Sequence, residues 1–288
     1  MPRRVFLAML LCSATLAART PEWERAHDLY QRTEYRQSLA ILLSLKQRDV
    51  LELQLIGQDY FMLGEYKKAT EVLEKAVVLD PENAECLHWL GRTFGRRAET
   101  GSPFTAPGYA SRARQMFEKA VALDPSNKEA TGDLLDFYLE APGFMGGGLH
   151  KAEELVARIA QTDPAEGHYA QAQLDDKRKA YDDAEQHLRH AVELAPRQVG
   201  RVVDLAKYVA KRGRIRESEA LFDQAMQMAP NSPKVLFERA DTYIKERRNL
   251  DDARELLERY IRSPLTPNDP PRERAEALLK KTALNVSR

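Results

Sequence analysis

The chain has 288 residues, of which 43% are hydrophobic, and its 44 Lys and Arg residues balance its 44 Asp and Glu residues. A net charge near zero provides no broad attraction to nucleic acid or to an anionic membrane surface, which argues against both as general partners. A single core rarely grows beyond about 250–300 residues, so the length favours several domains or a solenoid whose units pack only on their neighbours.

Residues 1–17 have the layout of a secretory signal peptide. Two arginines precede the apolar run over residues 5–11, and Thr15 and Ala17 are small residues at the two positions that a signal peptidase reads. We expect cleavage after Ala17 and export of the mature chain to the periplasm or the medium. An uncleaved membrane anchor is the alternative, but the apolar run is too short to span a bilayer comfortably. No membrane-spanning segment is expected after cleavage.

Cleavage would remove Arg3, Arg4 and Cys12, leaving 42 basic and 44 acidic residues and one cysteine, Cys86. A lone cysteine cannot form a disulfide within the chain, so an oxidising compartment would add no covalent link. Cys86 lies beside Leu87, and this position favours a small packed side chain over a reactive thiol.

A phrase that ends in proline recurs along the mature chain. Leu-Asp-Pro ends a helical pattern at Pro81 and Pro125, and related phrases end at Pro164, Pro196 and Pro230. A small residue lies twelve positions before each proline: Ala69, Ala113, Ala152, Ala184 and Ser218. A bulky apolar residue lies eight positions before each: Leu73, Phe117, Val156, Leu188 and Phe222. These positions share one helix face, where the small residues let a second helix approach and the bulky ones fill the gap.

The spacing of the phrases identifies the repeated unit. Successive prolines are 44, 39, 32 and 34 residues apart, so the basic unit has about 34 residues, the period of a tetratricopeptide repeat. Small residues of the expected first helices also recur, at Gly57, Gly91, Ala172, Ala206 and Ala240. Gly64 and Gly213 fall where tight turns between the helices are expected. The chain therefore resembles the tetratricopeptide repeat family over nearly all of its mature length.

This resemblance implies an all-α, right-handed superhelical α-solenoid of helix-turn-helix units over residues 21–264. The seven units are expected at about residues 21–47, 50–83, 84–127, 128–164, 165–198, 199–232 and 233–264. The fourth and fifth depart most from the pattern, because Leu135, Ile159 and Asp175 replace a small residue, an alanine and an aromatic residue. A proline-rich joint and a charged helix at residues 271–285 follow, and this helix fits the polar cap that a solenoid end needs.

Two units are longer than the period, the third by ten residues and the fourth by five. We expect both surpluses between the paired helices, over residues 96–107 and 141–148, because the spacing within each helix is normal. Insertions on one edge of a solenoid often belong to its binding face, so Phe104, Phe144 and Met145 are candidate rim residues above the groove. The alternative is that the two loops only pack together and stiffen the middle of the array.

The sequence contains no motif of a catalytic, cofactor or metal site. His-Glu-x-x-His, paired Cys-x-x-Cys, Gly-x-Ser-x-Gly and dinucleotide patterns are absent, and the glycines of residues 146–148 lack the Lys-Ser/Thr of a phosphate loop. His187 and His190 share one helix face but avoid its packed positions, which predicts a solvated surface. No catalytic residue, cofactor or metal ligand is expected, and the protein is interpreted as a non-enzyme.

In the family that the chain resembles, the first helices of the units line a concave groove that contacts peptides. Mapped onto this sequence, the candidate groove residues are Phe61, Arg92, Arg96, Tyr169, Lys207 and Lys211. Further contact positions are Leu51, Gln54, Gln58, Met62, His88, Glu129, Asp136, Glu140, Gln173, Lys177, Phe237, Asp241 and Lys245. The lysine–asparagine clamp of chaperone-tail-binding relatives is not reproduced, which argues against recognition of that type of C-terminal carboxylate. A helix or an extended segment could fit such a mixed groove.

These observations favour a non-catalytic, monomeric scaffold or adaptor in the cell envelope that binds a protein or peptide through its concave groove. A second hypothesis is a small-ligand-binding or enzyme-associated protein with a pocket under the two central loops. Thermal stabilisation by small metabolites, without any protein partner, would favour that hypothesis. A third is a solenoid that stacks end to end, against which the polar C-terminal helix argues.

Overall fold

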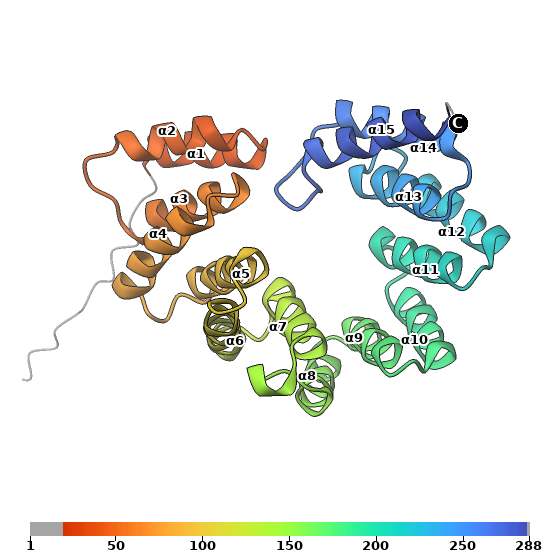
Figure 1. Ribbon diagram of the computed structural model, residues 1–288, viewed down its shortest axis with the longest axis horizontal. Coiled ribbons are helices and arrows are strands. Elements are labelled where there is room, and N and C mark those ends of the chain that lie inside the picture. Colours follow the sequence, from red (N-terminus) through yellow and green to blue (C-terminus); the bar gives the residue numbers. More distant parts are fainter. Residues whose placement is uncertain (1–19, 287–288) are drawn as a thin grey trace, which may run out of the picture.

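The computed structural model of the protein describes residues 20–286 and is built from helices throughout that range. Successive helix pairs follow one another around an arc, so that the first and the last pairs face each other across its opening (Figure 1). The expected all-α solenoid is thereby confirmed. The expected signal peptide, residues 1–17, lies outside the described residues.

Seven helix pairs and one final helix make up the arc. Their bounds are α1 (Pro21–Gln31) with α2 (Tyr35–Ser44), α3 (Val50–Met62) with α4 (Tyr66–Leu79), α5 (Ala84–Thr100) with α6 (Ala106–Leu123), α7 (Lys128–Glu140) with α8 (Leu149–Thr162), α9 (Pro164–Lys177) with α10 (Tyr181–Leu194), α11 (Val199–Lys211) with α12 (Ile215–Met228), α13 (Pro233–Lys245) with α14 (Leu250–Arg262), and α15 (Arg272–Val286). The first helix of each pair lies on the inner side of the arc (Figure 1).

Polar side chains define where several first helices begin. The side chain of Asp49 accepts from the backbone N–H of Leu51 and Glu52, while the Glu52 carboxylate accepts from the Asp49 N–H. Asn83 and Asn127 accept, through Oδ1, from the N–H groups three residues later at 2.9 Å. Such caps satisfy N–H groups that the helix itself leaves free, and each stabilises by about 0.5–2 kcal/mol. Local sequence thus sets the register of each pair.

Small residues on the first helices allow close packing within a pair. A Cβ atom added at Gly57 would lie 2.4 Å from Leu73 Cγ, and one at Gly91 would lie 2.6 Å from Phe117 Cδ1. The space that each missing side chain leaves is filled by the bulky residue of the second helix, which confirms the packing expected from the repeated phrase. Contacts between neighbouring pairs then join these units into continuous apolar clusters.

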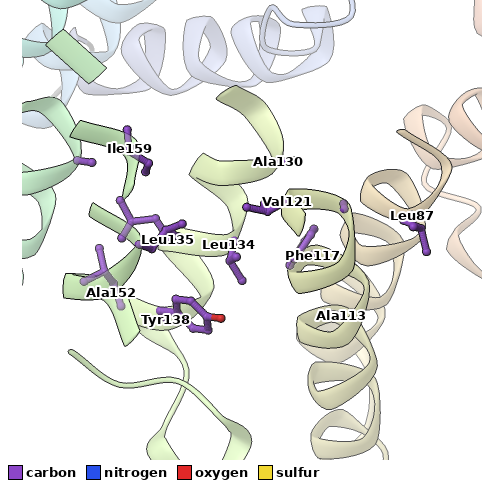
Figure 2. Close-up of a cluster of buried hydrophobic side chains, with 14 of the residues drawn as sticks. Leu87, Ala113, Phe117, Val121, Ala130, Leu134, Leu135, Tyr138, Ala152 and Ile159 are labelled. Atoms are coloured by element: carbon purple, nitrogen blue, oxygen red, sulfur yellow. The ribbon is translucent and has the colours of Figure 1, made fainter. Parts of the chain in front are cut away.

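The largest of these clusters lies in the middle of the arc. Figure 2 shows Leu134, Leu135 and Tyr138 of α7 between Phe117 of α6 on one side and Ile159 of α8 on the other. Leu135 is 1% exposed, so the leucine that departs from the repeat pattern is accommodated as a core residue. The fourth unit therefore keeps the architecture of its neighbours with a different packing of side chains.

Residues with left-handed backbone recur in the turns between paired helices. Gly64 and Gly213 have φ values of 75° and 77°, as their positions in the sequence predicted. Thr33, Lys179 and Arg247 adopt the same conformation, with φ between 53° and 63°, in turns where glycine is absent. The turn geometry is thus conserved between units even where its preferred residue is missing.

The prediction of a long loop over residues 96–107 of the third unit is wrong. Helix α5 has 17 residues and α6 has 18, against 13 and 14 in the second pair, so most of the surplus extends the two helices. Only residues 101–105 connect them. The guanidinium of Arg97 lies 4.1 Å from the ring centroid of Tyr109 and donates to its hydroxyl, which joins the two extensions. Pro107, in the first turn of α6, is compatible with a helix start.

The surplus in the fourth unit does form a loop, at residues 141–148. It contains a 3₁₀ turn, η1 (Gly143–Met145), that packs beside α6. Gly146 and Gly148 have φ values of 92° and 134°, which other residues rarely adopt. The Gly148 N–H donates to the Tyr138 carbonyl at 2.8 Å, and this bond closes the loop. The backbone conformation of the loop therefore explains why glycine occupies these two positions.

The chain turns back toward the inner side of the arc between α14 and α15. Leu265 is buried, and the Tyr260 hydroxyl donates to the Pro270 carbonyl oxygen. Thr266 Oγ1 donates to Asp269 Oδ2 at 2.9 Å and tightens the tip of the loop. Figure 1 shows this loop projecting from the end of α15 into the interior of the arc, while α15 covers α14.

Candidate binding groove

Three cavities lie along the first helices on the inner side of the arc. We call them the N-terminal cavity (about 470 Å³), the central cavity (about 820 Å³) and the tyrosine cavity (about 610 Å³). Asp136 of α7 lines all three, Arg92 lines the first two, and Tyr169 lines the last two. Because neighbouring cavities share these walls, they form one groove, which reaches from α3 to α13.

Phe61, Arg92 and Arg96 are brought together in the N-terminal cavity. The Arg92 guanidinium lies 4.4 Å from the Trp89 ring centroid and 5.1 Å from that of Phe61. Asp133 Oδ2 lies 3.6 Å from Arg92 Nε. Stacked and paired in this way, Arg92 is held in one orientation with its charge at the cavity wall.

Arg96 is held one turn further along α5. Its Nε donates to the Tyr66 hydroxyl at 3.3 Å, and its guanidinium lies 5.6 Å from that ring centroid. The hydrogen bond with Tyr66 raises the pKa of Arg96 above the usual value of an arginine. Arg96 also pairs with Glu99 on the same helix, and its side chain stays exposed at the cavity.

Tyr169, Lys207 and Lys211 are brought together in the tyrosine cavity, separate from the first three candidates. Lys207 Nζ lies 2.6 Å from Glu238 Oε2, and Lys211 Nζ lies 3.0 Å from Asp176 Oδ2. The candidate residues therefore form two groups at different positions along one groove.

Sequence reasoning missed Asp204, and it placed Asp136 in the groove without recognising its position. Both carboxyls line the central and tyrosine cavities. Desolvation in the concavity, together with the nearby charges of Asp133 and Glu140, raises the pKa of Asp136 to about 6. Burial likewise raises the pKa of Asp204. Asp204 could have been found from its position seven residues before Lys211, on the same face of α11.

The C-terminal loop is the second feature that sequence reasoning missed. Residues 267–271 line the central cavity opposite Lys128, Glu129 and Arg92. In the sequence this proline-rich stretch resembles only a joint before the last helix. The loop instead narrows the groove near its middle, because the arc brings residues that are over 130 positions apart to one cavity.

The three candidate rim residues do not line any of the three groove cavities. Phe104 is 96% exposed in the short linker before α6, and Phe144 is 82% exposed in η1. Met145 is partly buried in the same turn. A fourth cavity of about 540 Å³ lies beside residues 101–105, but Phe104 is not part of its lining. None of these four cavities is lined by Phe104, Phe144 or Met145.

The histidines of the fifth unit differ from expectation. His187 is only partly exposed, and its Nδ1 lies 2.8 Å from His168 Nδ1 of α9. His190 stays exposed and bonds Glu193 at 3.0 Å. Over residues 20–282, no set of three or more His, Cys, Asp or Glu side chains has an arrangement that could hold a metal ion. Cys86 is buried, and its Sγ donates to Gln54 Oε1 at 3.3 Å.

None of the helices in the described range combines the length and the hydrophobicity that crossing a bilayer requires.

Sequence comparison identifies the repeats. Residues 57–96 match the TPR repeat and residues 209–281 match the tetratricopeptide repeat. No curated protein matches the chain.

Solved structures of two tetratricopeptide repeat proteins have a similar arrangement of helices. One is a tetratricopeptide repeat protein of Parabacteroides merdae, with 14% identity and a TM-score of 0.57, covering 91% of this chain and 97% of that one. Another is a thermophilic TPR protein of Thermus thermophilus, with 19% identity and a TM-score of 0.53, covering 65% and 97%. The human IFIT1 dimer with PPP-AAAA is similar at 18% identity and a TM-score of 0.52, covering 84% and 54%. At such identities the similarity establishes the fold alone.

Proposed function

From the tetratricopeptide repeats that this chain contains, we propose that the protein is a non-catalytic scaffold that binds a segment of a partner protein along its concave groove. One observation carries the proposal: Asp136 lines all three cavities, Arg92 and Tyr169 each line two neighbouring ones, and the cavities therefore form one elongated site. Elongated concave surfaces are the binding surfaces of solenoid proteins. A groove that follows the first helices of several units suits a helix or an extended segment.

The side chains in the groove also suit recognition of a peptide. Arg92 and Arg96 are stacked on aromatic rings, and Lys207 and Lys211 are held by carboxylates. Side chains held in this way lose little conformational entropy when a partner binds, which favours affinity. The carboxyls of Asp136 and Asp204 line the same groove, so a partner whose charges match this mixed pattern would be selected over others.

The proposal includes export from the cytoplasm, with residues 1–17 as the cleaved signal. The predicted result is a mature protein that begins at Ala18, because Thr15 and Ala17 supply the small residues that signal peptidase reads. Intact mass spectrometry of protein from a periplasmic fraction measures this directly. A full-length mass, or recovery only from the cytoplasm, would contradict export.

Reversal of the two arginines of the N-terminal cavity is the test of groove binding. We expect Arg92→Glu with Arg96→Glu to weaken partner capture by about tenfold or more. The two cations of the N-terminal cavity become carboxylates, which would repel the acidic side chains of a partner that the arginines attract. Crosslinking of the mature protein in cells identifies the partner, and titration with that purified partner gives the affinity. Circular dichroism should show unchanged helix content, since neither side chain belongs to the apolar clusters.

The matched control reverses two arginines away from the groove. Arg197 and Arg216 are exposed and line none of the cavities described above, so Arg197→Glu with Arg216→Glu changes the charge equally. This control should retain the affinity of the wild type. Equal loss in both variants would indicate a general charge effect, and no loss in either would remove the N-terminal cavity from the binding site.

A further inference from the structure

The tyrosine cavity has an apolar base and aromatic walls. Leu139, Ala172 and Leu188 line it and are buried, while the rings of Tyr169 and Tyr208 are partly exposed beside them. Its volume of about 610 Å³ exceeds that of a single side chain, and its mouth opens into the groove. The cavity can therefore receive one long side chain of a segment bound in the groove.

The four lysines that line this cavity are already neutralised. Lys177 Nζ lies 2.9 Å from Glu140, Lys207 Nζ 2.6 Å from Glu238, Lys211 Nζ 3.0 Å from Asp176, and Lys245 Nζ 2.6 Å from Asp241. An acidic ligand would have to compete with four existing carboxylates for these cations. The cavity is thus poorly suited to a carboxylate or phosphate, despite its four lysines.

Two carboxyls of the cavity, those of Asp136 and Asp204, are less completely paired with basic side chains than the lysines are with acids. Among the described residues, no basic side chain forms an ion pair with Asp136. Asp204 lies 3.5 Å from Arg201 Nη1, but Arg201 also pairs with Glu166, so one guanidinium serves two acids. Desolvation raises the pKa of both carboxyls; Lys234, Arg201 and Lys207 partly offset it at Asp204, whereas only the acids Asp133 and Glu140 act on Asp136.

Tyr169 lies beside both of these carboxyls. Asp204 and Asp136 are each close enough to raise the pKa of its hydroxyl, after the larger effect of burial. One ring contact of Tyr169 is with the Arg201 guanidinium, 3.9 Å from the ring centroid. A guanidinium is therefore already accommodated against this ring within the protein, next to an acid.

We propose that the tyrosine cavity receives a Lys or Arg side chain of the bound partner segment, with its cation between Asp136 and Asp204 and its methylene stem against Tyr169 and Tyr208. This inference rests on the proposed function and adds to it the chemistry of one anchor side chain. The long apolar stem fits the base of the cavity, and the terminal cation supplies the ion-pair partner that Asp136 lacks among the described residues, with Asp204 as a second acceptor.

Selection from a library of random twelve-residue peptides displayed on phage tests the inference with the intact mature protein. Selected peptides should share Lys or Arg at one position. A synthetic peptide of the commonest sequence should bind the wild type about tenfold more tightly than its counterpart with that residue changed to Gln, because a charged hydrogen bond is lost. Fluorescence anisotropy measures both affinities.

The protein variants separate the cavity from general charge effects. Asp136→Asn should reduce the affinity for the basic peptide about tenfold and leave the Gln peptide unchanged. Asp183→Asn removes an exposed carboxylate of α10 that lines none of the cavities, and it should bind both peptides as the wild type does. Circular dichroism of both variants checks that the fold is intact.

The outcomes distinguish the inference from the function on which it rests. Peptides that bind without a shared basic residue, or that bind Asp136→Asn equally well, would overturn the anchor while leaving the groove as a peptide site. Failure to select any peptide, from a library that yields binders to a control domain, would count against both.

Discussion

Raising the pH from 4 to 8 is expected to destabilise the N-terminal units by about 5 kcal/mol through a single carboxyl group, that of Asp59. Its side chain is fully buried on α3, where Ser38 Oγ donates to its Oδ2 at 2.7 Å. The other oxygen, Oδ1, has no hydrogen-bond partner among the described residues. Burial without a cation favours the neutral acid and raises the pKa of Asp59 to about 8.

The sign of the effect follows from the two protonation equilibria. Near pH 4 the Asp59 carboxyl starts to ionise in the unfolded chain, while in the folded chain it stays neutral up to about pH 8. Between these values folding requires uptake of a proton, and stability falls by about 1.4 kcal/mol per pH unit. The contribution is complete below pH 4 and is lost as the pH rises through the folded pKa.

Asp59→Asn isolates this contribution. Asparagine has the shape of the neutral acid and can still accept from Ser38, so it should match the wild type near pH 4 and be more stable at pH 8. A solenoid can unfold from one end, so hydrogen exchange of residues 20–79 is the appropriate measurement, supported by urea unfolding. Asp28→Asn, at an exposed position of α1, should keep the pH dependence of the wild type. Equal slopes in all three proteins would contradict a buried neutral Asp59.

The same substitution at two glycines of α5 is expected to change stability in opposite directions. At Gly91 an added Cβ would lie 2.6 Å and 2.7 Å from two ring atoms of Phe117, which is confined within the largest apolar cluster. Either the ring or the helix must move, so Gly91→Ala should cost about 1–3 kcal/mol. At Gly95, one turn later, the added Cβ would have no heavy atom within 4 Å apart from its chain neighbours and its own helix backbone. Gly95→Ala should stabilise by about 0.5–1 kcal/mol, because alanine restricts the unfolded chain and favours the helix.

Urea unfolding of the two variants and the wild type gives both values, and hydrogen exchange of α5 and α6 localises them. The control is internal, since the two sites share one helix and receive one chemical change. Stabilisation by Gly91→Ala would show that α5 and α6 are not in close contact at this point. Destabilisation by Gly95→Ala would imply a neighbour that fills the open space beside it.

The repeated phrase was sufficient to predict the helix pairs because it combines signals that act locally. The prolines end each unit, Asn83 and Asn127 cap the next helix, and Gly64 and Gly213 adopt the left-handed turn. The third unit was mispredicted because Gly and Pro near residues 101–108 indicated a loop. The contact of Arg97 with Tyr109, across the pair, instead supports two longer helices.

The candidate groove was predictable in part for the same reason. Phe61, Arg92 and Tyr169 lie on the same face of their first helices, though at different positions of the repeat, and each lines a groove cavity. Nothing in the local pattern distinguishes Asp136 from other exposed acids, because its special position depends on three cavities that meet at α7. The same limit applies to the rim residues Phe104 and Phe144, which the repeat pattern could place on an edge but not above a pocket.

The sequence by itself determined that this protein is a series of helix pairs, where most of the pairs turn, and which faces of the helices pack. These features depend on backbone preferences and on contacts within about 34 residues, which a repeat copies along the chain. Only the tertiary structure decided how charges compensate one another and how far the groove is narrowed by residues 267–271. Both depend on the curvature of the whole arc, which adds small rotations from every unit and brings distant residues together.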